Sequence, residues 1–278
     1  MGISKSGNTL ETIANVNILV KKQHKNVFIV GNGKNTLREI ALDLKSEVID
    51  HNNFIGGRYS VLSEVGMVPA ILMGLNEKKF KQLNNLIKKK PFLNFLISSV
   101  GETLNLMKNK RSNSIILNYD DNLNSFLSWY QQLVAESLGK KGKGINPTLS
   151  FAPKDHHSLL QLYLDGPRDK FFTFFNSSKK EDKIKISQDM IPNNMKFLKN
   201  KNLKFIIDSQ SNALKNIFKL KNIPFRQFTF KKENEEELGE IFTFFVLETI
   251  FLSRLMNINP FNQPAVEQVK IETKKYLK

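Results

Sequence analysis

Short apolar runs that alternate with helix-length spacers are the feature that most limits what this sequence can fold into. The runs lie at residues 27–30, 47–49, 114–117, 148–151, 171–175, 205–207 and 225–230. Most of them are apolar on both faces, which is typical of buried parallel strands, and the spacers between them are long enough for helical crossovers. We therefore predict an α/β fold with two sheets.

The spacers themselves carry helical patterns. Residues 121–138, 157–164 and 235–256 repeat apolar side chains every 3.6 positions. A further helix is predicted at 36–44, after Gly31-Asn32-Gly33. We interpret that segment as an ordinary strand-to-helix turn, because a dinucleotide-binding turn needs a third glycine at the right offset.

A lysine-rich helical stretch joins the two predicted sheets. It runs from Asn76 to Lys110, and Lys88-Lys89-Lys90-Pro91 is expected to break it.

The charge balance indicates an anionic partner. Lys and Arg number 42 against 26 Asp and Glu, a formal net charge of +16. The basic residues are scattered, whereas nucleic-acid binding requires a basic stripe with interleaved aromatic residues, so no nucleic-acid partner is expected. With no cysteine in the chain, disulfides, thiolate metal sites and cysteine nucleophiles are excluded.

Membrane and secretory segments are not expected either. The longest apolar stretch, residues 241–252, contains Thr243, Glu248 and Thr249, and Met1–Glu11 is polar. A membrane-spanning helix needs about 18 apolar residues, and a signal peptide needs an apolar region near its start. We expect a cytoplasmic protein.

Three hydroxyl side chains stand near the N-terminus. Ser4, Ser6 and Thr9 flank a glycine at the start of a predicted helix. Free N–H groups and the helix dipole at such a start can bind an anion, while N-capping by Ser4 or Ser6 is the competing interpretation. A phosphate loop normally follows a buried strand, and so little chain precedes Ser4 that the loop looks as if it has lost its strand.

Five segments together resemble the glucose-6-phosphate isomerase (phosphoglucose isomerase) family, from Ile3 to Lys270. They are SKSGNTLET at 4–12, GGRYSVLS at 56–63, QLVAESLGK at 132–140, HSLLQL at 157–162 running into Asp165-Gly166-Pro167, and FNQP at 261–264 followed by VEQVK at 266–270. The Gly-Gly-Arg-Tyr-Ser segment is close to diagnostic of the family, whereas each of the others is weak alone.

The resemblance implies two SIS (sugar isomerase) domains, each an α/β/α sandwich with a parallel sheet flanked by helices. It implies a homodimer that interconverts glucose 6-phosphate and fructose 6-phosphate, in glycolysis and gluconeogenesis, through a cis-enediol intermediate and without a metal or organic cofactor. Matched to the family, residues 1–75 are the C-terminal part of the first SIS domain, 76–109 a helical linker, 110–262 the second SIS domain and 263–278 a C-terminal helix.

The resemblance also assigns roles residue by residue. Glu136 matches the base that moves the proton between C2 and C1, and Arg58 the arginine that stabilises the enediolate. His157 matches the histidine that assists ring opening from the partner subunit, and Lys270 the lysine near the ring oxygen. Phosphate binding falls to Ser4, Lys5, Ser6 and Thr9, with Gln263 closing over the phosphate.

The residue types suit these roles, although each has a plainer explanation. A glutamate with a pKa near working pH can shuttle a proton, and arginine is a permanent planar cation. Taken alone, Glu136 reads as a solvated helix residue, Arg58 as a salt-bridge partner and Lys270 as one lysine among many. His156 and His157 suggest a metal site, but neighbouring residues on a helix point apart and no third ligand follows, so none is expected.

One departure from the family is large. Members carry a segment before the Ser-Lys motif with a Gly-Xaa-Gly-Gly-Ser loop, and no Gly-Gly-Ser occurs in this sequence. We therefore expect an N-terminal truncation, an incomplete first SIS domain, and weak or absent activity from this chain. The alternatives are a non-catalytic SIS protein that binds sugar phosphates and an isomerase that also accepts mannose 6-phosphate.

Overall fold

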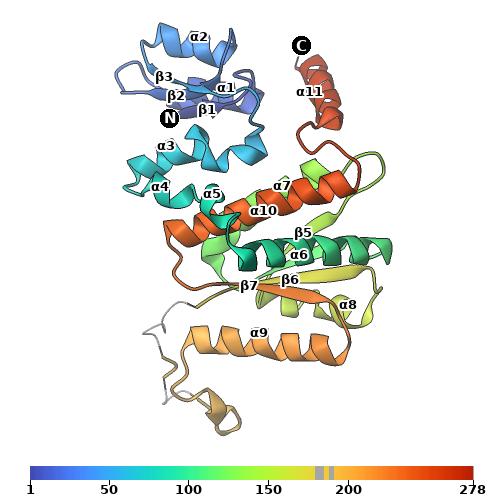
Figure 1. Cartoon of the computed structure of the whole chain (residues 1–278). Helices are drawn as coiled ribbons and strands as arrows, with labels where there is room; N and C mark the ends of the chain where they lie inside the picture. Colours follow the sequence, from blue (N-terminus) through green and yellow to red (C-terminus); the bar gives the residue numbers. More distant parts are fainter. Residues whose placement is uncertain (179–184, 188–190, 278) are drawn as a thin grey trace. The chain divides into compact units, whose positions relative to one another are not determined.

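Two compact units make up the chain in the computed structural model, which describes residues 1–178, 185–187 and 191–277 (Figure 1). Unit 1 comprises Met1–Lys89, Leu238–Val246 and Phe261–Lys278, and unit 2 comprises Lys90–Glu237 and Leu247–Pro260. Each unit contains a parallel sheet with helices packed against it. The predicted α/β fold with two parallel sheets is confirmed.

The sheet of unit 1 has the order β1-β2-β3, with β1 at Gly2–Ser4, β2 at Val27–Gly31 and β3 at Glu47–His51. All of its strands run parallel, and Ser4 pairs with Val30. A three-residue strand therefore does precede the hydroxyl-rich loop, so the interpretation that the loop lacks a strand is wrong. The sheet packs against α1 (Leu10–Leu19) and α2 (Thr36–Asp43) through Phe28 and Leu37, both fully buried.

The rest of unit 1 consists of short helices. They are η1 (Gly57–Leu62), α3 (Glu64–Leu72), α4 (Glu77–Phe80), α5 (Leu83–Leu86) and α11 (Pro264–Tyr276). Met67 and Phe80 pack together with Leu238 from α10 (Glu235–Leu255). Beside them a Cβ on Gly239 would lie 2.3 Å from the Phe80 carbonyl oxygen, so only glycine lets the α10 backbone approach this closely.

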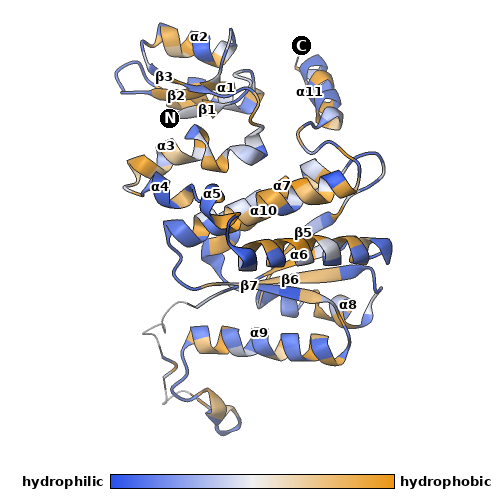
Figure 2. Cartoon of the chain, in the orientation of Figure 1, coloured by the Kyte–Doolittle hydropathy of each residue, from blue (hydrophilic) through white to orange (hydrophobic). Residues whose placement is uncertain are grey.

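The sheet of unit 2 has the order β5-β4-β6-β7, and all its pairings are parallel. Its strands are β4 (Asn113–Asn118), β5 (Asn146–Phe151), β6 (Lys170–Ser177) and β7 (Phe225–Phe230). Residues 171–177 of β6 are all buried, and Figure 2 shows the hydrophobic colouring of this strand. Its aromatic side chains account for the apolar run that predicted it.

The helices of unit 2 largely follow the predicted spacers. They are α6 (Lys90–Lys108), η2 (Asp121–Leu123), α7 (Asn124–Leu138), η3 (Lys154–His156), α8 (Leu160–Asp165), η4 (Asn193–Leu198), α9 (Leu203–Leu220) and the C-terminal half of α10. The break predicted at Lys88–Pro91 is confirmed, because α6 begins at Lys90. The helix predicted from His157 begins only at Leu160, after the 3-10 turn.

The strand predicted at 205–207 is wrong, because these residues lie in the first turns of α9. The side chain of Asn202 accepts a hydrogen bond from the Phe205 N–H at 2.7 Å, which caps the helix. Further along, Ser211, Leu214 and Phe218 are buried three and four positions apart, the spacing of one helix face. The mixed colouring of α9 in Figure 2 reflects this two-sided character.

A buried ion pair lies inside unit 2. Arg226 on β7 pairs with Glu248 on α10, whose side chain is 2% exposed. Arg226 also donates to the Tyr130 hydroxyl at 2.9 Å, and the Ser99 hydroxyl donates to Glu248 at 2.6 Å. Burial raises the pKa of Tyr130 far above its usual value, so its hydroxyl keeps its proton. The network joins α6, α7, β7 and α10.

Candidate functional site

The hydroxyl-rich loop of unit 1 brings its predicted residues together. The Ser4 hydroxyl lies 3.0 Å from that of Thr9, and the Ser6 hydroxyl lies 3.3 Å from the same Thr9 oxygen. Helix α1 begins directly afterwards, with Thr9 as N-cap residue and no side-chain cap bond. Capping by Ser4 or Ser6 is therefore wrong, and the hydroxyls gather beside a helix start whose first N–H groups have no intrahelical acceptor.

Gly7 shapes this loop through its backbone. Its φ of +63° lies in the left-handed region, and an added Cβ would come within 1.8 Å of the Asn35 amide oxygen. Asn35 in turn caps α2 by accepting from the Arg38 N–H. The Asn8 amide oxygen accepts from the Thr36 hydroxyl at 2.9 Å, which ties the loop to the same helix. Asn8 and Asn35 were not predicted from the sequence, although Asn35 before a helical run is a recognisable cap signal.

Lys5 contributes to the loop in a different way. Its side chain is exposed, and its carbonyl accepts from the Gly31 N–H at 3.1 Å. This backbone bond anchors the loop to the end of β2 and leaves the ammonium group in solvent.

Arg58 and Gln263 form the second cluster of unit 1. Arg58 is 3% exposed, and its guanidinium donates to Gln263 Oε1 at 2.8 Å and to the Asn262 carbonyl at 3.1 Å. The guanidinium also stands 5.3 Å from the ring centre of Tyr59. Because a guanidinium is permanently protonated, Arg58 places a fixed cation at this position. Asn262 was not predicted, because it makes the contact through its backbone carbonyl, which every residue type has.

Lys270 lies apart from that contact. It is on α11, about two turns or 10 Å beyond Gln263 along the helix. Its side chain is 59% exposed and its ammonium group lies 2.6 Å from Glu267 Oε1, an i,i+3 pair.

Glu136 lies on α7 in unit 2. Its side chain is half-buried and accepts from the Gln132 amide nitrogen at 2.8 Å. The partner stands one helical turn earlier, a spacing that allows side chains to meet. Gln132 was not singled out from the sequence, although this i,i+4 spacing could have identified it.

His157 and His156 face different surroundings. His157 is exposed, just after η3, and its N–H donates to the Lys154 carbonyl. The Nε2 of half-buried His156 lies 2.8 Å from the Tyr119 hydroxyl. Burial, followed by the charge of His157, lowers the pKa of His156 despite the opposing effect of Asp155. Neutral His156 therefore accepts the hydrogen bond from Tyr119, whose own pKa burial raises.

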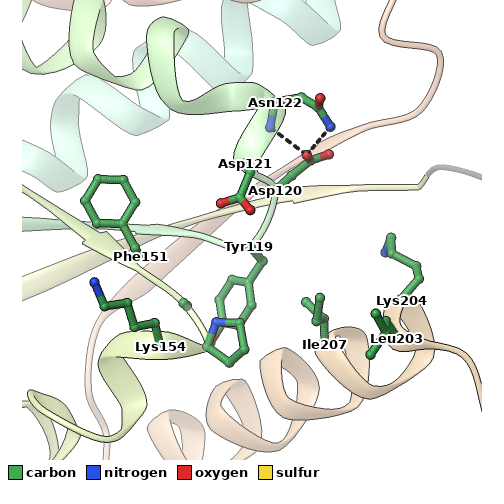
Figure 3. Close-up of a pocket in the computed structure, with 11 residues that line it drawn as sticks. Tyr119, Asp120, Asp121, Asn122, Phe151, Lys154, Leu203, Lys204 and Ile207 are labelled. Carbon is green, nitrogen blue, oxygen red and sulfur yellow. Dashed lines mark hydrogen bonds between the residues drawn. The ribbon is translucent and has the colours of Figure 1, made fainter. Parts of the chain in front are cut away.

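A hollow of about 790 Å³ opens at the carboxyl ends of β4 and β5. Figure 3 shows Phe151 and Lys154 on one side of it and Leu203, Lys204 and Ile207 from α9 on the other. Open α/β sheets bind ligands at this edge. The lining residues include none of the predicted site residues, and Asp120 and Asp121 stand among them with the two lysines.

The described residues contain no group of three or more His, Cys, Asp or Glu side chains placed to hold a metal ion. No helix within those residues is long and apolar enough to cross a membrane.

The sequence matches known proteins over nearly its whole length. The profile of the family described as phosphoglucose isomerase matches residues 3–277. Glucose-6-phosphate isomerase of Methanocaldococcus jannaschii is 33% identical over 285 residues, which cover 96% of this chain and 69% of that protein. The probable glucose-6-phosphate isomerase of Methanococcus maripaludis is 35% identical over 289 residues, covering 96% and 63%. The chain thus spans about two thirds of the length of these relatives.

Solved structures share the fold. A hypothetical protein of Thermus thermophilus superposes with a TM-score of 0.84 at 23% identity, covering 99% of this chain and 70% of that one. A glucose-6-phosphate isomerase of Chlamydia trachomatis gives a TM-score of 0.73 at 18% identity, covering 99% and 58%.

Proposed function

The chain belongs to the phosphoglucose isomerase family, and from this premise we propose that it interconverts glucose 6-phosphate and fructose 6-phosphate through a cis-enediol intermediate. The observation that carries the proposal is the buried guanidinium of Arg58, held in place by Gln263 and Asn262. An enediolate develops negative charge on its oxygens, and a preorganised cation in a water-poor place stabilises that charge most effectively.

Glu136 is the proposed base that carries the proton between C2 and C1. A carboxylate can take the C2 proton of the open-chain aldose and return it to C1, so one residue serves both steps. Its hydrogen bond to the neutral Gln132 amide orients the carboxylate without neutralising it. Arg58 is the proposed cation that stabilises the charge formed when the C2 proton leaves.

The loop of Ser4, Lys5, Ser6 and Thr9 is the proposed phosphate site, with Gln263 closing over it. The gathered hydroxyls and the N-terminus of α1 provide neutral donors and a favourable dipole. A phosphate fixed there supplies binding energy away from the reacting carbons.

Ring opening is assigned to His157 and Lys270. An imidazole can act as acid or base at the hemiacetal, and a lysine near the ring oxygen can donate a proton to it. We propose a homodimer in which His157 comes from the partner subunit. The exposure of His157 supports this arrangement, and loss of turnover on dilution to the monomer tests it. A protein of this activity belongs to glycolysis and gluconeogenesis in the cytoplasm, and cell fractionation tests that location.

The test of the activity is a coupled assay of the 278-residue chain with fructose 6-phosphate. As expected from the sequence, the turnover of this chain should be weak at most, and any turnover should fall at least about 10³-fold in Glu136→Gln, since this change removes the proton acceptor and preserves the shape. Glu240→Gln, at an exposed position of α10, is the matched control and retains the wild-type rate.

The same assay separates the other hypotheses. A chain that binds sugar phosphate without turnover is the non-catalytic SIS protein, and comparable rates on mannose 6-phosphate identify a dual isomerase. Full turnover in Glu136→Gln would overturn the assignment of the base.

A further inference from the structure

In the sequence, the turn that contains Arg58 lies between His51 and Glu64, and the side chains of these two residues are in contact. His51 ends β3 and Glu64 begins α3, thirteen positions later, and His51 Nδ1 makes a very short contact with Glu64 Oε1. His51 is 1% exposed. The same carboxyl oxygen accepts from the Asn52 N–H at 3.1 Å, so Glu64 holds both the ring and the backbone that follows it.

The second ring nitrogen also faces an oxygen. His51 Nε2 lies 3.1 Å from the carbonyl oxygen of Ile55, an atom that can only accept a hydrogen bond. A neutral imidazole carries one N–H, whereas the imidazolium carries two and satisfies both oxygens. Burial acts to raise the pKa of Glu64, but N–H groups of the backbone and the contact with His51 outweigh it and lower that pKa. Glu64 is therefore a carboxylate, which accepts a hydrogen bond from Nδ1–H of His51.

Residues 52–54, which follow His51, are exposed and bury little apolar surface, so hydrogen bonds hold this segment in place. Phe54 is 95% exposed, and Asn52 and Asn53 beside it are exposed as well. Three other bonds hold the segment: the Phe54 and Ile55 N–H groups donate to Asn52 at 2.9 and 3.0 Å, and the Asn53 amide donates to the Asn32 carbonyl at 3.1 Å. The ring of His51 adds a contact at Ile55, directly before Gly56 and Gly57, the two most permissive residues of the turn.

The bonds continue from Ile55 to Arg58. The carbonyl of Gly56, the next residue, accepts from the Tyr59 N–H at 2.9 Å, and the carbonyl of Gly57 accepts from the Ser60 hydroxyl at 2.7 Å. These bonds close the first turn of η1, which contains Arg58. His51 thus fixes the base of the turn while Gln263 and Asn262 hold the guanidinium at its tip.

We propose that His51 is a positioning residue: together with Glu64 it clamps the Gly56–Arg58 turn, so that the Arg58 guanidinium meets the charge that forms on the substrate. The inference rests on the proposed function, because it concerns the arginine of that reaction. The clamp acts on the transition state, where the charge develops, and leaves the phosphate loop unchanged.

The kinetic test uses Glu64→Gln and His51→Gln, with circular dichroism to establish that each variant folds. We expect kcat to fall about 10-fold in both variants, while KM and the inhibition constant of inorganic phosphate change less than about 2-fold. Glu77→Gln makes the same chemical change in the first turn of α4 and retains the wild-type kcat. A wild-type kcat in both clamp variants, or an equal loss in Glu77→Gln, overturns the proposal.

A second readout does not depend on turnover. In protein labelled with ¹⁵N-histidine, Nδ1 of His51, assigned by its loss in His51→Gln, should resonate as a protonated nitrogen, because it donates to the Glu64 carboxylate. Amide exchange at Ile55–Arg58 should accelerate in Glu64→Gln. If the wild-type chain shows no turnover, the proposed function fails and these two measurements alone decide the clamp. An unprotonated Nδ1, or unchanged exchange, overturns it.

Discussion

The guanidinium of Arg58 donates to the amide oxygen of Gln263 across 205 positions of sequence, at 2.8 Å. The contact joins the turn after β3 to the start of α11, so two segments far apart in the chain define one charged position in unit 1. Because the Gln263 side chain is neutral, it orients the arginine without reducing its charge.

The first prediction concerns that arginine. Arg58→Lys removes the planar fork and should lower kcat by about 10²- to 10³-fold with little change in KM, since the lost interaction forms mainly in the transition state. Gln263→Leu removes the acceptor and should cost about 10-fold in the same quantity. Steady-state kinetics measure both. Arg254→Lys, at an exposed arginine of α10, is the control; if KM rises while kcat stays constant in Arg58→Lys, the assigned role is wrong.

The second prediction concerns Gly7 in the phosphate loop. Gly7→Ala places a Cβ 1.8 Å from the Asn35 oxygen at a φ of +63°, so the loop must shift. We expect KM for fructose 6-phosphate to rise about 10-fold. Gly74→Ala is the matched control, because Gly74 also has a positive φ but no atom within 4 Å of the added Cβ. Both variants lose about 1–2 kcal/mol for the left-handed backbone. Equal KM values in the two would contradict the role of the Asn35 contact.

The third prediction concerns the buried ion pair of unit 2. Arg226→Met leaves the Glu248 carboxylate, 2% exposed, without its cation. Removing one partner of a buried pair costs about 3–5 kcal/mol of unfolding free energy, whereas replacing both partners by apolar residues restores most of it. Urea unfolding followed by the fluorescence of Trp129, the single tryptophan, should therefore show a large loss in Arg226→Met and recovery in Arg226→Met with Glu248→Leu.

The surface pair Lys275–Glu272, with side chains 66% and 59% exposed, provides the comparison. Lys275→Met should change the stability by less than about 1 kcal/mol. If the double variant is as unstable as Arg226→Met alone, the expectation is wrong. The hydrogen bonds of the network, and not only the pairing of its two charges, would then stabilise unit 2.

The fourth prediction concerns pH. Because the pKa of His156 is lowered in the folded protein, the unfolded chain binds more protons between that pKa and the ordinary value of 6.5. Stability contributed by neutral His156 is therefore present above pH 6.5 and is lost as pH falls through 6.5 toward the lowered value. His156→Gln should flatten the fall in urea stability between pH 7.5 and 5.5. His24→Gln, at an exposed turn, should leave the fall unchanged; an equally steep fall in His156→Gln would contradict this account.

Hydrophobic patterning predicted the strands well where they are buried on both faces. β4 and β6 follow the runs 114–117 and 171–175 closely, because central parallel strands are apolar on both faces. The edge strand β7 also matches its run, 225–230, although Arg226, Gln227 and Thr229 interrupt it. The run at 205–207 was misassigned, because three apolar residues fit the start of a helix as well as a strand. The deciding signals were the cap at Asn202 and the later spacing of Leu214 and Phe218.

The candidate site was predictable only as far as motifs extend. Ser4 and Thr9 are close in sequence, so their contact follows from the loop. The family resemblance gave Arg58 and Gln263 separate roles, and their contact was not predicted. The pair of His51 and Glu64 was not predicted. Such a contact depends on how a strand end and a helix start come together, and no periodicity in the residues records it.

Unit 1 is built from three separate stretches of the chain, so the ribosome completes it in stages. Its first 89 residues leave the ribosome about 150 residues before Leu238, and its last segment begins only at Phe261. At about 5–20 residues per second, the early part waits roughly 7–30 s for the first of its missing pieces. Arg58 has no Asn262 or Gln263 to contact until the last segment, from Phe261 onward, has been synthesised. A nascent chain that stalls before Phe261 therefore lacks the last segment of unit 1, although most of unit 2 has already been synthesised. Such an incomplete unit is a substrate for chaperone binding.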